Sequence, residues 1–141
     1  MNNFLIGIGK RIKAIHFSKT KNQIYGIDKD INKISSIKKG KSYINYISNK
    51  DIKKIKKNSF FSNDYNSIKS SDVIIFCLPT PLKNNRPDLS YLKEACDKLK
   101  NKIRKGQILI LESTSYPGTT EDFLYKNLNL KRFELGKNFF L

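Results

Sequence analysis

The feature that most constrains the fold is an alternation of short apolar runs with segments whose apolar residues recur at helical spacing. The expected strands are residues 4–8, 23–27, 59–62, 73–78 and 107–111, and another begins at 139. The expected helices are residues 10–19, 31–37, 51–57, 89–103 and 119–128. The run Val73–Leu78 is apolar throughout, as is typical of a central strand covered on both faces. This alternation predicts an α/β fold with a Rossmann-like, doubly wound parallel sheet.

The length and composition of the chain favour a single domain spanning residues 1–141. Hydrophobic residues make up 38% of the chain, enough for one packed core, and no repeat or low-complexity linker divides it. No run is long and apolar enough to cross a membrane, so no membrane partner is expected. Cys77 and Cys96 both lie inside apolar segments. A disulfide framework is therefore not expected, and the sequence predicts a cytoplasmic location.

The charge balance is strongly basic, with 28 lysine and arginine residues against 12 acidic ones and a formal net charge of +16. Such a balance can indicate a nucleic acid, an anionic membrane or an anionic ligand as partner. The lysines are scattered over several helical segments, and aromatic residues do not alternate with them as a stacking platform requires. The pattern favours solvated surface lysines over a nucleic-acid interface, which stays the alternative.

The first expected strand ends in Gly7-Ile8-Gly9. Glycines at the tip of a strand allow a tight turn and let the backbone approach a pyrophosphate at the start of the next helix. The fingerprint of a dinucleotide site has a third glycine three residues further on, and Ile12 occupies that position here. The two glycines therefore predict a nucleotide-binding turn, with an ordinary turn as the alternative.

Asp28 follows the second expected strand, nineteen positions after Gly9. An acid at this point of a dinucleotide-binding sheet accepts hydrogen bonds from the ribose hydroxyls of NAD and repels the 2′-phosphate of NADP. The alternative is that Asp28 caps the next helix, but Asp30 is the better capping candidate. The spacing favours the ribose role for Asp28.

Two further strand tips carry polar residues. Leu78-Pro79-Thr80-Pro81 follows the central strand, and on composition alone it is a rigid turn with one hydroxyl. The fifth strand runs into Glu112-Ser113-Thr114, and Thr119 or Thr120 is placed to cap the helix behind Pro117-Gly118. Hydroxyls and free backbone N–H groups there suit an anionic ligand, and plain helix capping is an equally good interpretation.

Taken together, these residues resemble the N-terminal NAD-binding domain of the nucleotide-sugar 6-dehydrogenases, the UDP-glucose/GDP-mannose dehydrogenase family. The blocks that carry the resemblance are "IYGIDKD", "KKGKSYI", "SDVIIFCLPTPLKNNRPDLSYL", "KGQILILESTSYPGTTEDF" and "GKNFFL", in the family's order and spacing. They look most like the UDP-N-acetyl-hexosamine branch. The resemblance implies NAD as cofactor and a twofold oxidation of a UDP-sugar C6 alcohol to a carboxylate.

The resemblance also implies roles for individual residues. Thr114 matches a threonine beside the reacting centre that helps to hold a water, and it is the one candidate catalytic residue. Residues implied to lie along the cofactor are Gly7, Gly9, Asp28, Lys33, Pro79, Thr80, Ser113 and Thr114. No residue is predicted to bind a metal ion.

The chain also departs from the family pattern. The spacing from the glycine turn to Asp28 is about two residues short, and Asn45 or Tyr46 stands where the family has an acid. The later domains, with their catalytic lysine, asparagine, cysteine and aspartate, have no counterpart here. We therefore expect an inactive fragment that acts on a UDP-sugar only when the missing domains complete it. The alternatives are a subunit that needs a complementing chain and a degenerate, non-catalytic basic binding module.

Overall fold

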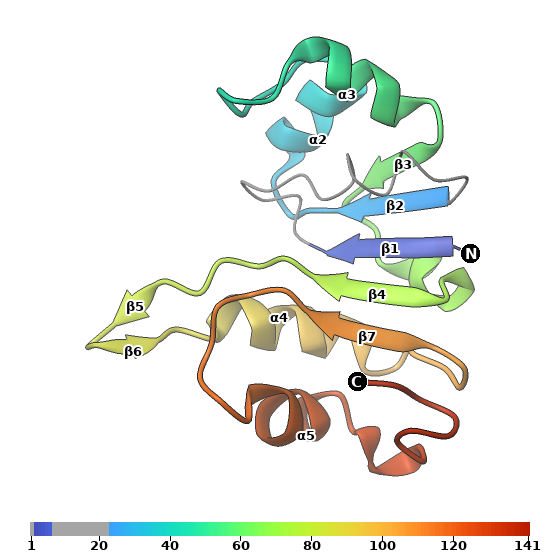
Figure 1. The fold of residues 1–141 in the computed structure, drawn as a ribbon, viewed down its shortest axis with the longest axis vertical. Coiled ribbons are helices and arrows are strands. Elements are labelled where there is room, and N and C mark those ends of the chain that lie inside the picture. Colours follow the sequence, from blue (N-terminus) through green and yellow to red (C-terminus); the bar gives the residue numbers. More distant parts are fainter. Residues whose placement is uncertain (1, 7–22) are drawn as a thin grey trace.

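The computed structural model describes residues 2–6 and 23–141, with the side chains described from residue 23 onward. Gly7, Gly9 and the expected helix 10–19 lie outside the described residues. The described chain forms a five-stranded parallel sheet in the order β3-β2-β1-β4-β7 (Figure 1). Its strands are β1 (Asn2–Ile6), β2 (Gln23–Ile27), β3 (Ser59–Ser62), β4 (Val73–Phe76) and β7 (Ile108–Leu111). The predicted α/β class with a parallel sheet is confirmed.

Helices connect these strands. The α-helices are α2 (Ile31–Lys38), α3 (Asn49–Lys56), α4 (Ser90–Leu99) and α5 (Tyr125–Asn127). Short segments of 3₁₀-helix, η1 (Asn66–Ser70) and η3 (Leu130–Arg132), and one π-helical segment, η2 (Thr119–Leu124), complete the set. The expected helix 89–103 ends four residues too late, because the chain leaves α4 after Leu99 while Ile103, 7% exposed, still packs into the core.

Side-chain caps explain where two of the helices begin. The Asp30 carboxylate accepts hydrogen bonds from the backbone N–H groups of Asn32 at 2.9 Å and Lys33 at 3.4 Å at the start of α2. The Ser48 hydroxyl accepts one from the N–H of Asp51 at 3.2 Å at the start of α3. Both contacts satisfy donors of the first turn that have no partner within the helix.

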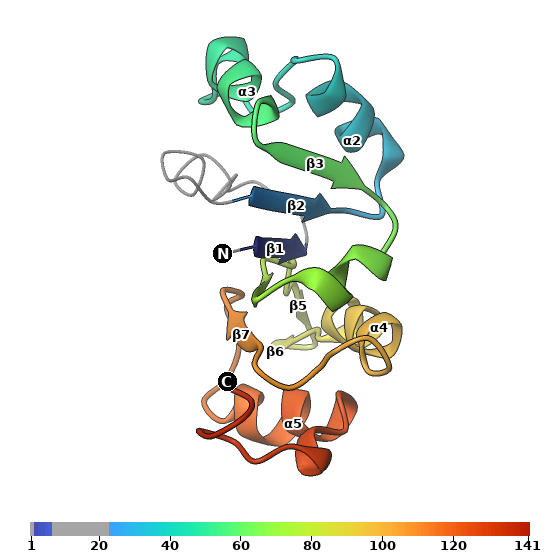
Figure 2. The ribbon, with the colours of Figure 1, turned by 90° about the vertical axis from the view of Figure 1, so that its right-hand side faces the viewer.

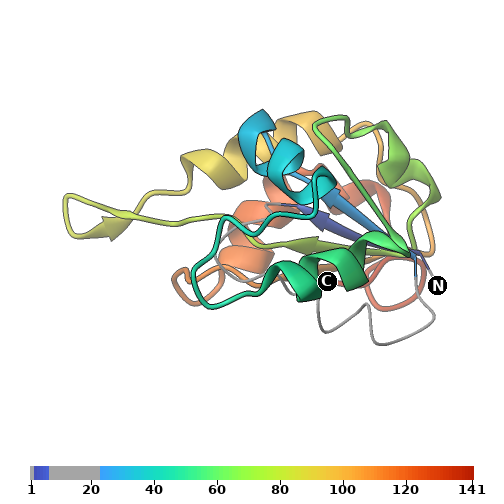
Figure 3. The ribbon, with the colours of Figure 1, turned by 90° about the horizontal axis from the view of Figure 1, so that it is seen from above.

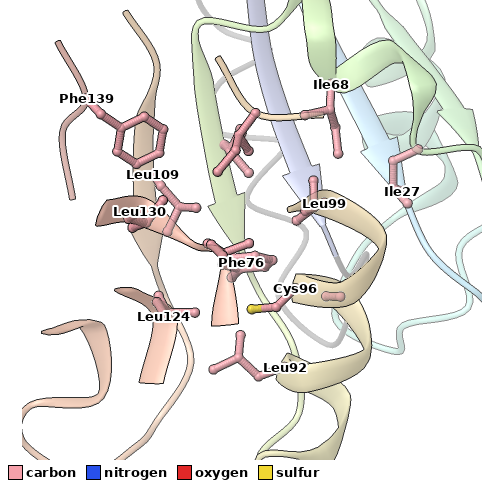
Figure 4. Close-up of a cluster of buried hydrophobic side chains, with 14 residues drawn as sticks. Ile27, Ile68, Phe76, Leu92, Cys96, Leu99, Leu109, Leu124, Leu130 and Phe139 are labelled. Atoms are coloured by element: carbon pink, nitrogen blue, oxygen red, sulfur yellow. The ribbon is translucent and has the colours of Figure 1, made fainter. Parts of the chain in front are cut away.

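The core divides into two clusters because neighbouring residues of a strand point to opposite faces of the sheet. On β4, Ile74 and Phe76 pack with α4, η2 and η3, whereas Val73 and Ile75 pack with isoleucines of α2 and α3. Figure 4 shows the first cluster, in which Phe76 lies between α4 and the C-terminal segments. Figure 2 shows α2 and α3 beyond β3 at one end of the molecule and α5 at the other.

A hairpin that the sequence did not predict follows β4. Its strands β5 (Leu82–Lys83) and β6 (Arg86–Pro87) are antiparallel, and it projects away from the sheet (Figure 3). Asn84 and Asn85 form the turn with φ angles of 51° and 58°, in the left-handed region that asparagine tolerates better than most residues. The sequence carries no Asn-Gly signal at this point, which is why only a rigid turn was expected.

The C-terminal strand that was expected to begin at residue 139 is reduced to two isolated bridges. Phe140 pairs with Ile108 in parallel, and Phe139 pairs with Leu135. Phe139 is fully buried, while Phe140 and Leu141 are about 40% exposed. Among the residues that the structure describes, no helix has the length and apolar character needed to cross a membrane.

Candidate functional site

The carboxyl ends of the five strands lie in one row. The parallel register aligns the strand ends Ser62, Ile27, Ile6, Phe76 and Leu111 side by side. The arrowheads of the strands in Figure 1 accordingly point the same way. The loops after β2, β4 and β7 therefore begin at the same edge of the sheet, which is where ligands bind in open parallel α/β sheets.

Asp28 is the first residue after β2 and is 8% exposed. Its N–H donates to the Ser62 carbonyl of the neighbouring strand at 3.2 Å, which holds the residue at the sheet edge. Carboxylate oxygen Oδ1 accepts from the N–H of Asp30 at 2.9 Å, and Oδ2 lies 3.8 Å from Nζ of Lys33. Asp30, and not Asp28, caps α2. The capping alternative for Asp28 is therefore wrong, and its carboxylate is held at the edge as an acceptor.

Two tyrosines that the sequence reasoning missed lie near this carboxylate. Burial raises the pKa of Tyr43, and the negative charges of Asp28 and then Asp30 raise it further. Burial also raises the pKa of Tyr65, with smaller contributions from the charges of Glu94 and Asp28. Both phenols therefore stay protonated at neutral pH. Tyr43 belongs to the "KKGKSYI" block, so its position was the available signal.

The loop after β2 is also tied to α4. Nζ of Lys29 lies 3.1 Å from a carboxylate oxygen of Glu94 and 4.6 Å from the centre of the Tyr91 ring. The Glu94 side chain pairs on its other oxygen with Lys98 at 2.8 Å. These contacts connect the edge beside Asp28 to the helix that covers β4, although each ion pair is solvent-exposed and adds little stability by itself.

The tips of β4 and β7 meet through side-chain hydrogen bonds. The N–H of Leu78 donates to Oγ of Ser113 at 3.0 Å, and the Thr80 hydroxyl donates to the backbone carbonyl of Thr114. Pro79 and Thr114 are exposed, and Thr80 and Ser113 are half-buried. The structure thus brings the four predicted residues of these two loops together, and it holds them beside the strand ends.

One local prediction at this edge is wrong. Neither Thr119 nor Thr120 caps the following helix, because Gly118 with φ of 86° occupies the capping position of η2 and no side chain bonds there. The Thr119 hydroxyl instead donates to the Tyr116 carbonyl at 2.6 Å and is buried. Within residues 2–6 and 23–141, no group of three or more histidine, cysteine or acidic side chains could hold a metal ion.

A parallel α/β sheet with a buried acid after its second strand and hydroxyl-bearing loops at the same edge defines a nucleotide-binding domain of the Rossmann type. The family model described as "UDP-glucose/GDP-mannose dehydrogenase family, NAD binding domain" matches residues 5–139. The chain belongs to this family, and its cofactor is NAD. The family resemblance read from the sequence is thereby confirmed.

Individual relatives agree with the family assignment. Protein CapL of Staphylococcus aureus is 30% identical over 123 residues, which cover 86% of this chain and 28% of that protein. UDP-N-acetyl-D-glucosamine 6-dehydrogenase of Pseudomonas aeruginosa is 31% identical over 110 residues, or 77% of this chain and 26% of the enzyme. The chain therefore spans roughly a quarter of the length of these two relatives.

Solved structures show the same fold. The UDP-D-ManNAc dehydrogenase of Pyrococcus horikoshii superposes with a TM-score of 0.88 at 29% identity, over 99% of this chain and 34% of that one. The UDP-N-acetyl-mannosamine dehydrogenase Cap5O of S. aureus also superposes with a TM-score of 0.88, at 23% identity, over 99% of this chain and 35% of that one. The likeness extends over nearly the whole chain, so it includes the edge described above.

Proposed function

We propose that this chain is the cofactor-binding part of an enzyme that oxidises the C6 alcohol of a UDP-N-acetyl-hexosamine to a carboxylate. The support is the family membership together with relatives named as UDP-N-acetyl-glucosamine and UDP-N-acetyl-mannosamine dehydrogenases. Alcohol to carboxylate is a four-electron oxidation, so two NAD molecules each accept one hydride and one water supplies the second oxygen. The chemistry on the sugar belongs to the whole enzyme, of which this chain supplies the NAD site.

The architecture we propose for residues 1–141 is a single domain with a doubly wound sheet. The packing supports it, because α4 lies against one set of β4 side chains and α2 and α3 lie against the other set. Helices on both faces exclude water from the parallel strands and leave the carboxyl edge open for the cofactor. A cytoplasmic location is part of the same proposal, since Cys77 and Cys96 do not form a disulfide.

The proposed role of Asp28 is to accept hydrogen bonds from the adenosine ribose hydroxyls. The residue fits this role because it is nearly buried and is fixed through its backbone N–H to β3, while Oδ2 is 3.8 Å from Nζ of Lys33. A negative charge at that point repels the additional phosphate of NADP. Lys33, the positive neighbour of Asp28, would lie on the adenosine side.

The remaining candidate residues divide between the other strand tips. Gly7 and Gly9 would let the backbone approach the pyrophosphate. Pro79, Thr80 and Ser113 would line the cofactor, which is supported by the hydrogen bonds that join the two loops carrying them. Thr114 would stand beside the reacting centre, where its exposed hydroxyl could hold a water.

The single observation that carries the proposal is the position of Asp28, and titration calorimetry with NAD tests it. We expect Asp28→Ala to bind NAD at least tenfold more weakly than the unchanged chain, because the ribose loses its acceptor. Asp28→Asn keeps the side-chain shape and the acceptor for the Asp30 N–H but loses the charge. We expect it to weaken NAD binding less and to improve binding of NADP relative to NAD.

The matched control is Asp30→Ala, which removes an acid two residues away that caps α2. We expect this variant to unfold about 1 kcal/mol more easily and to keep its NAD affinity within twofold. Thermal unfolding of each variant checks that it is folded at the titration temperature. Identical NAD isotherms for the unchanged chain and a folded Asp28→Ala would remove Asp28 from the site.

A complementing chain is a second proposal, and exposed apolar side chains near β7 support it. Ile110, Leu135, Phe140 and Leu141 are each between 38% and 42% exposed. Clustered apolar exposure of this kind is typical of surfaces that another segment covers. Mixing the chain with the separately produced remainder of the P. horikoshii relative and measuring NADH formation tests it, and no NADH above either part alone would count against it.

A further inference from the structure

Lysines gather on the surface at one end of the molecule. Residues 38–57 contain eight lysines and one acidic residue, and all eight lysines are exposed. We call this set the lysine cluster; its members are Lys38, Lys39, Lys41, Lys50, Lys53, Lys54, Lys56 and Lys57. They belong to two different helical segments and the loop between them, and the packing of these segments decides whether they share one surface.

Four of these lysines form one stripe along α3. Lys50, Lys53, Lys54 and Lys57 are spaced three, one and three residues apart, which places them on the same side of a helix. Ile52 and Ile55, at most 1% exposed, lie on the opposite side and pack into the core. The buried isoleucines determine how α3 is rotated, and this rotation turns the stripe to the solvent.

Contacts between α2 and α3 bring the remaining lysines beside the stripe. Nζ of Lys56 donates to the carbonyl oxygen of Lys38 at 2.5 Å, across the ends of the two helices. The Lys53 side chain lies over Gly40, where a Cβ would be 3.2 Å from its Cγ. The lysines of the α2 end and those of α3 therefore share one surface, at the end of the molecule beyond β3 (Figures 1 and 2).

The cluster is much less neutralised than the lysines of α4. On α4, Lys93 pairs with Asp97 at 2.6 Å, Lys98 pairs with Glu94 at 2.8 Å, and Lys100 pairs with Asp97 at 3.4 Å. Among the described residues, the one ion pair in the cluster joins Lys54 and Asp51 at 4.0 Å. Like charges held close together repel each other, and a bound polyanion relieves that repulsion.

We propose that the lysine cluster binds the phosphate backbone of a nucleic-acid duplex without reading its sequence. Lys50 and Lys57 are seven residues apart, which is about 10 Å along a helix. Duplex DNA carries roughly one charge per 1.7 Å of its axis, so the stripe faces several phosphates at once. The cluster contains no arginine, the residue that most often reads bases, so the contact is electrostatic.

The chemistry of the cluster favours a duplex over a membrane or a single strand. An amphipathic helix on a bilayer inserts its apolar side, but the isoleucines of α3 are already buried in the core. Single strands are held by several stacked aromatic rings. Within residues 38–57 one aromatic side chain, Tyr46, is largely exposed, at 72% of its surface, and one ring is too few for such stacking. Lys38 and Lys39 lie at the C-terminal end of α2, whereas Asp28 precedes its N-terminal end, and the proposal does not depend on the NAD site.

Fluorescence anisotropy with a short labelled DNA duplex tests the proposal, using the whole chain between roughly 50 and 200 mM salt. The test variant changes Lys50, Lys53, Lys54 and Lys57 to glutamine, which has a similar helix propensity. The control makes the same change at four exposed lysines outside residues 38–57: Lys69, Lys105, Lys126 and Lys131. Both variants carry the same net charge, so any difference between them reports on position.

We expect the test variant to bind the duplex at least tenfold more weakly and to lower the slope of log affinity against log salt by about 3 to 4. The control variant should stay within about threefold of the unchanged chain. The proposal is overturned if the unchanged chain does not bind at the lowest salt or if both variants weaken equally. It is also overturned if the chain binds phosphatidylserine vesicles but not DNA. Thermal unfolding of each variant checks that it is folded, independently of the NAD site.

Discussion

At the scale of single residues, two side chains of the same type differ in burial and in structural role. Asp28 and Asp30 are two positions apart, yet one is nearly buried at the sheet edge and the other caps a helix. Asp28 is held against the neighbouring strand by the hydrogen bond from its N–H to the Ser62 carbonyl, whereas Asp30 has already left the sheet and precedes α2. Cys77 and Cys96 differ likewise, since Cys96 is fully buried on α4 and Cys77 is half-buried after β4.

Burial raises the pKa of the Cys96 thiol to about 12, so Cys96 is neither a nucleophile nor a metal ligand at neutral pH. In a Cys77→Ser variant, we expect no reaction of Cys96 with a thiol reagent at about pH 8 until denaturant is added. Because the folded pKa exceeds the unfolded one, this thiol's contribution to stability is complete below about pH 9 and declines as the pH rises toward 12.

Unfolding titrations across this alkaline range provide the comparison. We expect the unchanged chain to lose more of its free energy of unfolding above about pH 9 than Cys96→Ala, while the titrations of tyrosines and lysines contribute to both. Rapid labelling of Cys96 in the native protein would contradict the burial on which this prediction depends.

At the scale of elements, one buried amide joins two segments of the chain that are distant in sequence. The side chain of Gln107, fully buried, donates to the carbonyls of Ile68 at 2.9 Å and Ser71 at 2.8 Å. Its Oε1 accepts from the N–H of Arg104 at 2.8 Å. Gln107 thus ties the end of η1 and the turn before β7 together, and so helps to align β4 with β7 at the edge that carries the candidate site.

We expect Gln107→Leu to lower the free energy of unfolding by about 2 kcal/mol, because the N–H of Arg104 loses its acceptor, while the carbonyls of Ile68 and Ser71 each lose one donor and keep another. Denaturant unfolding measures this value. Lys105→Leu is the neighbouring control, because residue 105 is exposed and such changes stay within about 0.5 kcal/mol. A loss below about 1 kcal/mol in Gln107→Leu would show that water replaces the amide at no great cost.

At the scale of the whole molecule, the chain is an NAD-binding domain that covers only part of its relatives' length. A ligand that binds the folded state alone stabilises it, by about 2.7 kcal/mol at a concentration of one hundred times its dissociation constant. We therefore expect NAD to raise the unfolding temperature of the chain and NADP to raise it less, as measured by scanning calorimetry. Equal shifts with both cofactors would contradict the proposed role of Asp28.

The same chain incubated with NAD and UDP-N-acetyl-glucosamine or UDP-N-acetyl-mannosamine should form no NADH. Thiol chemistry on an aldehyde intermediate needs an exposed, activated thiolate, and the pKa of Cys96 is raised by burial. NADH absorbance followed with time is the measurement, and a full-length relative is the positive control. Steady NADH production by the purified chain would overturn the view that it is a cofactor-binding part.

The sequence by itself determined the elements, because their signals are local. The bounds of β2 and β3 were predicted to the residue, and apolar spacing located α2, α3 and α4, since each buries one side against the sheet. The family blocks were also sufficient to identify NAD, which the family model confirms. These inferences need only neighbours along the chain.

Tertiary structure decided everything that depends on residues distant in sequence. It buried Tyr43 and Tyr65 within reach of the charge of Asp28, which raises their pKa, and it joined the loops of Thr80 and Thr114. It also gathered the lysines of α2 and α3 on one surface, where the sequence indicated dispersal. The physical reason is that strand register and the burial of isoleucines set which side chains meet, and both are properties of the packed sheet rather than of any short segment.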